Sequence, residues 1–401
     1  MRYGFQEYDG PPLEPLELYT AKSGEEIVTQ LYNFTDKGGR EVALRPEMTP
    51  TLARMVAARA NGLRKPIRWF SIPQLYRYER QQRGRLREHF QLNCDLIGEP
   101  GPLGDAEIIA LAIDAVRSFG LGPSDFRVRV SDRRVLGELL AGLGLDETQA
   151  AVAYQVLDKF GRVPREVSVG KLRDAAVGPD AINRLLELSG VRTWEAFREA
   201  AGALGGALGA GEPLRRTLAA LEAMGLAAYL DLDLTVVRGL AYYTGTVFEL
   251  FDARGELRAI CGGGRYDNLL QALGGVDLPA LGFGLGDVVL TELLRDRGLV
   301  PGEQSSIDVF LAGISEEDAP EVLALAHELR DAGMRVEYAL SPQPLGKQLR
   351  LADARNARLA VVLGPDERAR GELVVKDLVA KTQSAVPRDA VAPRLLETLR
   401  G

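Results

Sequence analysis

The chain has 401 residues, of which 46% are hydrophobic and 26% are charged, and its formal net charge is −7. This composition is typical of a globular protein with room for two or three domains, and the acidic charge argues against a nonspecific nucleic-acid binder. The sequence has no run of 18 apolar residues that would indicate a membrane span, and its N-terminus has no apolar secretory core. Two cysteines and two histidines are too few to make a structural zinc site the expected arrangement.

The first part of the chain predicts a strand, a helix and a hairpin. Residues 40–47, REVALRPE, are expected to form a strand that turns at Pro46. The stretch 49–63 predicts a helix that begins near Thr49 or Thr51, with Gly62 past its end. IRWFSIPQLYRYER (67–80) and LREHFQLNCDLIG (86–98) are rich in aromatic and β-branched residues, which favours two antiparallel strands. The turn between them, QQRGR, is rich in arginine.

The pattern then changes twice. Residues 105–119 predict a helix and 125–132 a strand, whereas residues 132–220 alternate helical periodicity with Gly and Pro breaks, which indicates a helical insertion. Strand signals return in LDLTVVRGLAYYTGTVFELF (232–251) and LRAICGGGRYDNLL (257–270). We therefore expect one domain in two parts, 1–131 and 221–298, interrupted by the insertion.

A separate domain is expected at the C-terminus. Residues 296–306, DRGLVPGEQSS, are typical of a linker. Beyond it, IDVFLAG, APEVLALAHELRDAG, RVEYAL, PLGKQLRLADARNA and LAVVLG alternate strand and helix periodicity. That alternation predicts a small α/β domain with a largely parallel sheet over residues 306–401.

The hairpin holds a local excess of positive charge. From Arg64 to Gln91 there are eight Lys or Arg and two Glu, a net of 8 − 2 = +6. A solvated charged face is the ordinary explanation of such a run. However, the arginines alternate with aromatic residues and glutamates, and guanidinium groups bind phosphate in a planar, bidentate way. The cluster therefore indicates a site for a nucleoside triphosphate.

YRYERQQRGRLREHFQ with its flanking strands resembles the second signature motif of class II aminoacyl-tRNA synthetases, specifically of the histidyl-tRNA synthetase family. LRPEMTP (44–50), VVRGLAYYTGTVFE (236–249) and GGGRYDNLL (262–270) resemble histidine-specific motifs of that family, and residues 307–401 its anticodon-binding domain. The sequences of these motifs most resemble the bacterial-like subtype found in plant organelles. The resemblance implies an α+β catalytic domain, an antiparallel sheet flanked by helices, with a helical insertion and a C-terminal anticodon-binding-like α/β domain.

The resemblance also implies an activity: ATP-dependent ligation of L-histidine to tRNA(His) through a histidyl-adenylate, with ATP and Mg²⁺, by a cytoplasmic homodimer. Two cysteines far apart are consistent with a reducing cytosol. Arg77 matches the arginine that binds the α-phosphate, and Arg238 the histidine-specific arginine that faces it across the reacting centre. A surface ion pair is the alternative interpretation of Arg238.

Further site residues follow from the same positions. The resemblance assigns histidine binding to Glu47, Met48, Thr49, Arg77, Gln91, Asp95, Arg238, Tyr242, Tyr243 and Tyr266. It assigns ATP binding to Arg77, Glu79, Arg85, Arg87 and His89, and it implies no metal ligand in the chain. For Phe248, and in part for Tyr242, packing in the core is the alternative, and for His89 a solvent-facing position on a strand.

The chain departs from the family pattern at several positions. Val289 replaces the third-motif arginine, which would leave the γ-phosphate to Arg85 or Arg87. Asp95 replaces a longer glutamate, and His89 an adenine-stacking phenylalanine. The resemblance further implies that about thirty to forty N-terminal residues, including the first-motif helix, are missing. The three glycines of GGGRYD lack the Lys-Ser/Thr of a phosphate loop, so we expect them to let the backbone pass beneath bound histidine.

These departures keep a second hypothesis open. A non-catalytic paralogue on the same scaffold would bind histidine or tRNA without chemistry, either as a regulatory subunit of ATP phosphoribosyltransferase or as a sensor of uncharged tRNA. The C-terminal domain argues against the regulatory subunit, which normally lacks it. Val289 and the short N-terminus favour the sensor, whereas Arg77, Arg238 and Glu47 together favour the enzyme.

Overall fold

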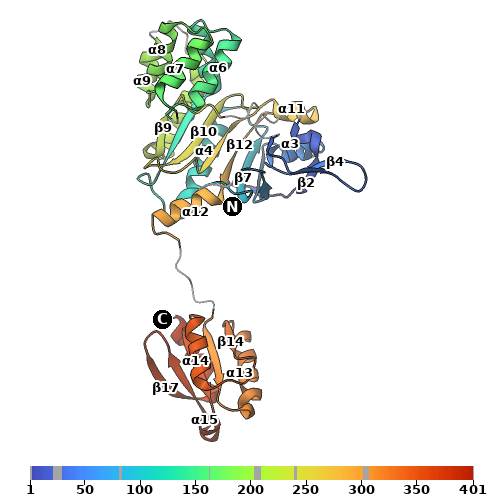
Figure 1. Ribbon diagram of the computed structural model, residues 1–401, viewed down its shortest axis with the longest axis vertical. Coiled ribbons are helices and arrows are strands. Elements are labelled where there is room, and N and C mark those ends of the chain that lie inside the picture. Colours follow the sequence, from blue (N-terminus) through green and yellow to red (C-terminus); the bar gives the residue numbers. More distant parts are fainter. Residues whose placement is uncertain are drawn as a thin grey trace. The chain divides into compact units, whose positions relative to one another are not determined.

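The computed structural model describes residues 2–20, 29–80, 84–161, 163–202, 209–238, 242–300 and 307–400 (Figure 1). The chain divides into two compact units, Met1–Val300 and Pro301–Gly401. The predicted linker at 296–306 falls partly outside the described residues. Its first residue, Asp296, is the last residue of a helix.

A large sheet forms the centre of the first unit, and the described residues contribute nine strands to it. The order is β1-β5-β7-β12-β11-β10-β8-β9, with β6 paired to β7. Its middle pairs are antiparallel, while β1–β5 and β8–β9 at the edges are parallel. The strands are β1 Gln6–Glu7, β5 Ile67–Ser71, β6 Gln74–Tyr76, β7 Glu88–Ile97, β8 Phe126–Asp132, β9 Leu230–Leu232, β10 Thr246–Asp252, β11 Cys261–Arg265 and β12 Ala280–Gly286. The predicted α+β class and helix-flanked antiparallel sheet are confirmed.

The arginine-rich hairpin is present. Strands β5 and β6 both pair antiparallel with the long β7, placing Trp69 opposite Asp95 and Tyr76 opposite Glu88. The predicted first strand is divided at Ile72–Pro73, because proline donates no hydrogen bond to a ladder. Residues 81–83 of the predicted turn lie outside the described residues.

Helices cover the sheet around two apolar clusters. Alternation along the strands separates these clusters: Phe248 belongs to one and its neighbour Val247 to the other. The core position of Phe248 is therefore confirmed. The helices are α3 Thr49–Ala57, α4 Pro102–Arg117, α10 Gly211–Ala223, α11 Leu269–Gly274 and α12 Asp287–Asp296, with a short 3₁₀ turn at Ala227–Tyr229. Among these helices, α3 and α11 belong to the Val247 cluster, and α4, α10 and α12 to the Phe248 cluster.

A group of helices stands apart from the sheet between β8 and α10 (Figure 1). These helices are α5 Arg133–Gly142, α6 Glu147–Asp158, α7 Arg165–Asp174, α8 Pro179–Leu188 and α9 Trp194–Gly202. The first four of them, α5 to α8, bury a cluster around Leu157, Leu172 and Leu185, whereas α9 contributes Phe197 to the Phe248 cluster. By contrast, α10 packs on α4. None of the helices in the described ranges is both long and apolar enough to cross a bilayer.

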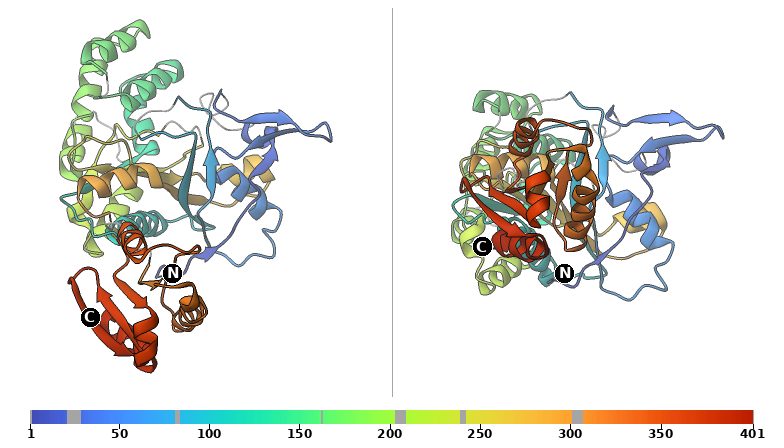
Figure 2. Two further views of the ribbon diagram at one scale, coloured as in Figure 1. Left: turned by 60° about the horizontal axis from the view of Figure 1, so that its bottom comes forward. Right: turned by 90° about the horizontal axis from the view of Figure 1, so that it is seen from below.

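A small three-stranded sheet lies beside the large one and projects from it in each view of Figures 1 and 2. It consists of β2 Leu13–Pro15, β3 Asn33–Thr35 and β4 Glu41–Leu44, with α1 Leu16–Thr20 packed on it. The chain leaves β4 through the predicted turn at Pro46 and enters α3 at Thr49. This passage brings residues 45–49 to the edge of the large sheet.

The second unit is a five-stranded sheet in the order β14-β13-β15-β16-β17. The prediction of a largely parallel sheet holds for β14, β13 and β15 only, since β16 and β17 add an antiparallel hairpin that the alternation did not reveal. The strands are β13 Val309–Gly313, β14 Val336–Tyr338, β15 Leu359–Leu363, β16 Glu372–Asp377 and β17 Thr382–Pro387. The helices are α13 Ala319–Asp331, α14 Leu345–Ala354, α15 Pro365–Arg370 and α16 Val391–Arg400, with 3₁₀ turns at Glu316–Asp318 and Arg388–Ala390.

Candidate active site

A pocket of about 960 Å³ opens over the large sheet in the first unit. Its walls come from the hairpin, from the start of α12, from the loop between β10 and β11, and from the segment that follows α6. Six of the sequence-predicted residues line it: Arg77, Glu79, Arg85, His89, Gln91 and Arg238. The fold therefore gathers side chains that lie more than 150 residues apart in the chain.

Three glycines of the sheet, Gly262, Gly284 and Gly286, line the floor of this pocket. By strand register, β11 and β12 place five glycines on the same face as Glu249, namely Gly262, Gly264, Gly282, Gly284 and Gly286. A Cβ at Gly262 would lie 2.1 Å from Arg238 Nη1, and one at Gly284 would lie 2.1 Å from Gln91 Nε2. Side chains of the site itself thus lie directly over Gly262 and Gly284, and the passage of this backbone beneath bound histidine stays a prediction.

Arg238 is held in a fixed position at this floor. Its φ of 61° is unusual for a residue with a side chain. Its Nη1 donates to Glu249 at 2.7 Å, and its Nη2 lies 3.5 Å from the Tyr243 hydroxyl. Its Nε is buried and has no hydrogen-bond partner among the described residues. Burial opposes the charge, but Tyr243 and Glu249 outweigh it and raise the pKa of Arg238 above its usual value. A permanent, oriented cation results.

Arg77 contributes a second guanidinium on the hairpin side. Its Nε donates to the carbonyl of Pro46 at 3.0 Å, which fixes the side chain by the backbone, and within the described ranges no carboxylate pairs with it. Nearby, Arg85 pairs with Glu79 at 2.8 Å. His89 is half-buried on the wall, where burial, followed by the charge of Arg77, lowers the pKa of its imidazole. A neutral imidazole face is therefore presented at pH 7.

Behind the pocket lies a buried polar cluster. The Tyr242 hydroxyl donates to Glu47 at 3.0 Å, and the Tyr266 hydroxyl donates to Asp95. Asp95 is buried, and its neighbour on the adjacent strand is Gly282. The glycine leaves room for the carboxyl group, because a Cβ there would lie 2.2 Å from Asp95 Oδ1. Burial raises the pKa of Asp95 to about 7, although the Tyr266 hydrogen bond opposes that rise. These carboxylates and hydroxyls can accept and donate hydrogen bonds to a small polar ligand.

Three predicted residues take other positions. Met48 is 1% exposed and packs with Leu52 in the core. Arg87 lies over the ring of Tyr78 at 4.6 Å and lines a smaller hollow rather than the main pocket. Thr49 is the first residue of α3 and is half-buried. Sequence patterns alone did not distinguish these positions from the pocket wall.

The structure also reveals pocket residues that the sequence analysis missed. Glu249, the ion partner of Arg238, lies on the wall together with Arg129, Arg192 and Arg258. Arg129 and Glu249 are register partners on β8 and β10. Alternation places each of them on a definite strand face, but nothing in the sequence indicates that the two strands are neighbours.

The arginine of the GGGRYD motif has a structural position. Arg265 is buried, its Nη2 lies 2.9 Å from Asp105 Oδ2, and it donates to the carbonyls of Glu99 and Gly101. Burial raises the pKa of Asp105 to about 6 against the opposing effect of Arg265. Because every arm of the guanidinium is used, Arg265 ties the start of α4 to β11 and does not face the pocket.

A divalent cation would depend on the nucleotide for most of its ligands. In the described ranges, no group of three or more His, Cys, Asp or Glu side chains could hold a metal ion. Two pocket carboxylates, Glu79 and Glu249, are paired with arginines. Phosphate oxygens and water are the usual partners of Mg²⁺ in nucleotide sites. A cation that arrives with ATP fits this pocket, whereas an independent metal site does not.

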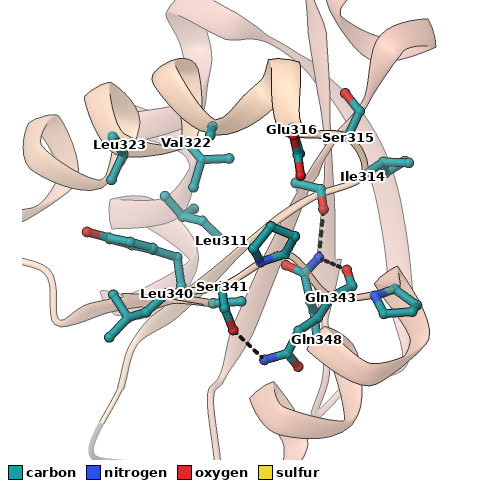
Figure 3. A pocket seen from close by; sticks show the side chains of 16 residues that line it. Leu311, Ile314, Ser315, Glu316, Val322, Leu323, Leu340, Ser341, Gln343 and Gln348 are labelled. Carbon is teal, nitrogen blue, oxygen red and sulfur yellow. Dashed lines mark hydrogen bonds between the residues drawn. The ribbon is translucent and has the colours of Figure 1, made fainter.

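The second unit has its own pocket of about 590 Å³ (Figure 3). In Figure 3, Val322 and Leu323 on α13 face Leu340 across the hollow. Gln348 closes one end and donates to the carbonyls of Gly313 and Gln343, each at 2.7 Å. The pocket lies at the carboxyl ends of the parallel strands β13 and β14, where α/β sheets commonly bind ligands.

Two family models match the chain. One is described as histidyl-tRNA synthetase and matches residues 1–287, and the other as an anticodon binding domain and matches residues 308–398. The two matches coincide closely with the two compact units.

Individual relatives agree with these models. A histidine–tRNA ligase of Opitutus terrae is 49% identical over 97% of this chain and 90% of its own length. A chloroplastic/mitochondrial histidine–tRNA ligase of Arabidopsis thaliana is 40% identical over 96% of this chain and 78% of its own length. A histidyl-tRNA synthetase structure from Nostoc sp. PCC 7120 superposes with a TM-score of 0.83 at 24% identity, over 99% of this chain and 92% of the other. The last likeness bears on the fold alone.

Proposed function

This chain belongs to the histidyl-tRNA synthetase family, and we propose that it is an enzyme that ligates L-histidine to tRNA(His), using ATP to form a histidyl-adenylate. The observation that carries the proposal is the pair of oriented guanidinium groups, Arg77 and Arg238, on the wall of one pocket over a glycine floor. Both are fixed before any ligand arrives, Arg77 by a backbone carbonyl and Arg238 by Glu249.

In this proposal the two arginines act on the α-phosphate of ATP. When the histidine carboxylate attacks, negative charge grows on the phosphoryl oxygens, and preorganised cations stabilise that charge more than the ground state. Arg77 and Arg238 hold the phosphoryl group, and Gln91 lies close to Arg238 on the same floor. Pyrophosphate leaves, and the ribose hydroxyl at the tRNA 3′ end then attacks the carbonyl carbon of the histidyl-adenylate, so that the ester forms as AMP is released.

Histidine would be bound by the polar cluster behind this centre. Glu47, with the hydroxyl of Thr49, accepts hydrogen bonds from the α-ammonium group. Asp95 accepts a ring N–H and so selects one imidazole tautomer, while Tyr266 fixes the orientation of Asp95. Tyr242 and Tyr243 supply the remaining hydroxyl groups. A ligand that lacks a ring N–H would leave Asp95 with the Tyr266 hydroxyl as its donor and without a bond to the ligand, which provides the basis for selectivity.

ATP would lie along the hairpin side of the pocket. His89 offers an uncharged ring face for the adenine, and the pair of Arg85 and Glu79 lies on the wall beside it. We expect Mg²⁺ to enter with the nucleotide and to neutralise part of its phosphate charge. Arg87 faces a separate hollow, and this position argues against a direct contact between Arg87 and ATP.

For the second unit, we propose that the pocket beside Leu340 receives a base of the tRNA anticodon loop. Its exposed apolar side chains suit an unstacked base, and its backbone and amide groups can meet a base edge. We further propose a cytoplasmic homodimer, as the family resemblance implies. Light scattering of the purified chain tests the dimer, because a monomeric mass at micromolar concentration would contradict it.

The alternative, a non-catalytic paralogue, has less support. The relatives that cover nearly the whole chain at 40–49% identity are named ligases. In addition, the chain has the anticodon-binding unit that a regulatory subunit normally lacks. Val289 remains the feature that favours loss of activity, because it puts an uncharged side chain on the pocket wall.

The deciding experiment is exchange of labelled pyrophosphate into ATP, run with each of the twenty amino acids. We expect exchange with histidine alone, followed by charging of tRNA(His). Arg238→Ala should lower the exchange rate about 100- to 1000-fold, because one preorganised contact to the transition state is lost, and should also lower the melting temperature, because Glu249 loses its partner. Histidine binding without any exchange in the wild-type protein would support the sensor instead.

A further inference from the structure

Charge compensation divides the six pocket arginines into two groups. Four have carboxylate partners: Arg85 with Glu79, Arg238 with Glu249, and both Arg129 and Arg192 with Asp233 at 3.6 Å. Arg77 and Arg258 have no carboxylate partner in the described part of the chain. Unpaired guanidinium groups on the wall of one pocket attract an anion, and the field is stronger where protein walls limit solvent.

Arg258 lies at the outer end of the pocket. It belongs to the loop between β10 and β11, and its side chain is exposed. A Cβ at Gly84 would lie 3.5 Å from Arg258 Cδ and 3.5 Å from Val289 Cγ2, so hairpin, loop and α12 meet there. Gly84 N also donates to Glu292 of α12 at 3.2 Å, which holds the hairpin in this position. Val289 brings no charge to this end.

We propose that Arg258 binds the distal phosphates of ATP, and of the pyrophosphate product. This inference rests on the proposed function, in which Arg77 and Arg238 hold the α-phosphate. Arg238 is mostly buried at the floor, whereas Arg258 is exposed at the mouth. A triphosphate with its α-phosphate at the floor extends toward the mouth, where Arg258 is the arginine without a carboxylate partner among the described residues of the pocket wall. Its side chain acts by binding and by orienting the leaving group.

Calorimetric titration with ATP and with AMP tests the inference independently of catalysis. For Arg258→Ala we expect ATP affinity to fall about 10- to 100-fold, the size of a lost charged hydrogen bond, and AMP affinity to stay within about twofold. The ATP affinity of Arg258→Lys should lie between those of the wild type and Arg258→Ala, because the ammonium group keeps the charge but loses the bidentate geometry. An exposed loop side chain should not change the melting temperature.

Arg254→Ala is the matched control. Arg254 belongs to the same loop and is exposed, but it is not part of the pocket wall. Its replacement by alanine removes the same charge as Arg258→Ala without changing the pocket. We expect its affinities for ATP and AMP to match those of the wild type. An equal loss in Arg254→Ala would reduce the effect to general charge and would overturn the contact. An unchanged ratio of ATP to AMP affinity in Arg258→Ala would overturn it as well.

The two proposals fail in different ways. If the wild-type protein catalyses no histidine-dependent exchange but loses ATP affinity on Arg258→Ala, the ligase function fails and the phosphate contact stands. If exchange occurs and Arg258→Ala leaves the KM for ATP unchanged, the contact alone fails. Absence of ATP binding to the wild-type protein would overturn both.

Discussion

At the scale of single residues, the most informative group is the carboxyl of Asp95. Burial raises its pKa from 3.8 to about 7, so the folded protein holds this proton more tightly than the unfolded chain does. The unfolded chain therefore releases the proton first as pH rises. The free energy of unfolding must fall between about pH 4 and pH 7, by an amount on the order of a few kcal/mol. Such a cost is consistent with a group retained for binding rather than for stability.

We expect Asp95→Asn to separate these two effects. The amide has no charge to bury, so the ligand-free variant should melt at a higher temperature than the wild type at pH 8. The difference should shrink toward pH 5, where the wild-type carboxyl is protonated in the fold. At pH 8 its affinity for histidine should be about 10- to 100-fold weaker, because an acceptor is exchanged for an amide. Melting temperatures across this pH range, with histidine titrations at pH 8, provide the check. An equal melting difference at both pH values would refute the assigned pKa.

At the scale of elements, β11 and β12 determine the shape of the pocket because their glycines carry no side chains. Glycines on one face let Arg238, Gln91 and Asp95 lie flat against the sheet. On the other face, a glycine is needed at position 263 for close backbone packing, since a Cβ there would lie 2.3 Å from the carbonyl oxygen of Gly282. Gly262, Gly282 and Gly284 make room for side chains of the site, and Gly263 permits backbone packing.

Two alanine variants should therefore behave oppositely. Gly284→Ala places a methyl group against the flexible end of Gln91, so we expect at least about a tenfold loss in exchange activity and a melting shift below about 3 °C. Gly263→Ala forces the backbone apart and should cost about 1–3 kcal/mol or more, with a clearly lower melting temperature. Thermal unfolding of both variants, alongside exchange kinetics, tests this division. Equal destabilisation by both would contradict it.

At the scale of the whole molecule, chemistry and tRNA selection are expected to reside in separate units. The first unit holds the pocket over the large sheet, and the second holds the pocket of Figure 3. Leu340 lines that second pocket and is 91% exposed, so its side chain is available to an apolar partner. Damage to this surface should affect recognition of tRNA and leave the formation of adenylate intact.

Leu340→Asp should raise the KM for tRNA(His) about threefold to tenfold, since an apolar contact is lost and a charge faces the nucleic acid. Histidine-dependent pyrophosphate exchange should be unchanged. Val379→Asp is the control, because Val379 is 75% exposed in the same unit but lies outside the pocket. Aminoacylation kinetics decide the matter: equal effects of both substitutions, or none from Leu340→Asp, would remove the pocket from tRNA recognition.

The sequence by itself determined the family, the class of fold and six residues of the pocket wall, because motifs such as YRYERQQRGRLREHFQ and VVRGLAYYTGTVFE join residue types to fixed local spacing. It also predicted the hairpin and the position of Phe248 in the core, since alternation along a strand is a local property. Tertiary structure alone decided which charges meet. Glu249, Arg129 and Arg258 reach the pocket through strand order and loop geometry, and Arg265 is drawn into a buried ion pair with Asp105. Met48 and Arg87 match the family motifs but point elsewhere, because burial depends on neighbours that are distant in the chain.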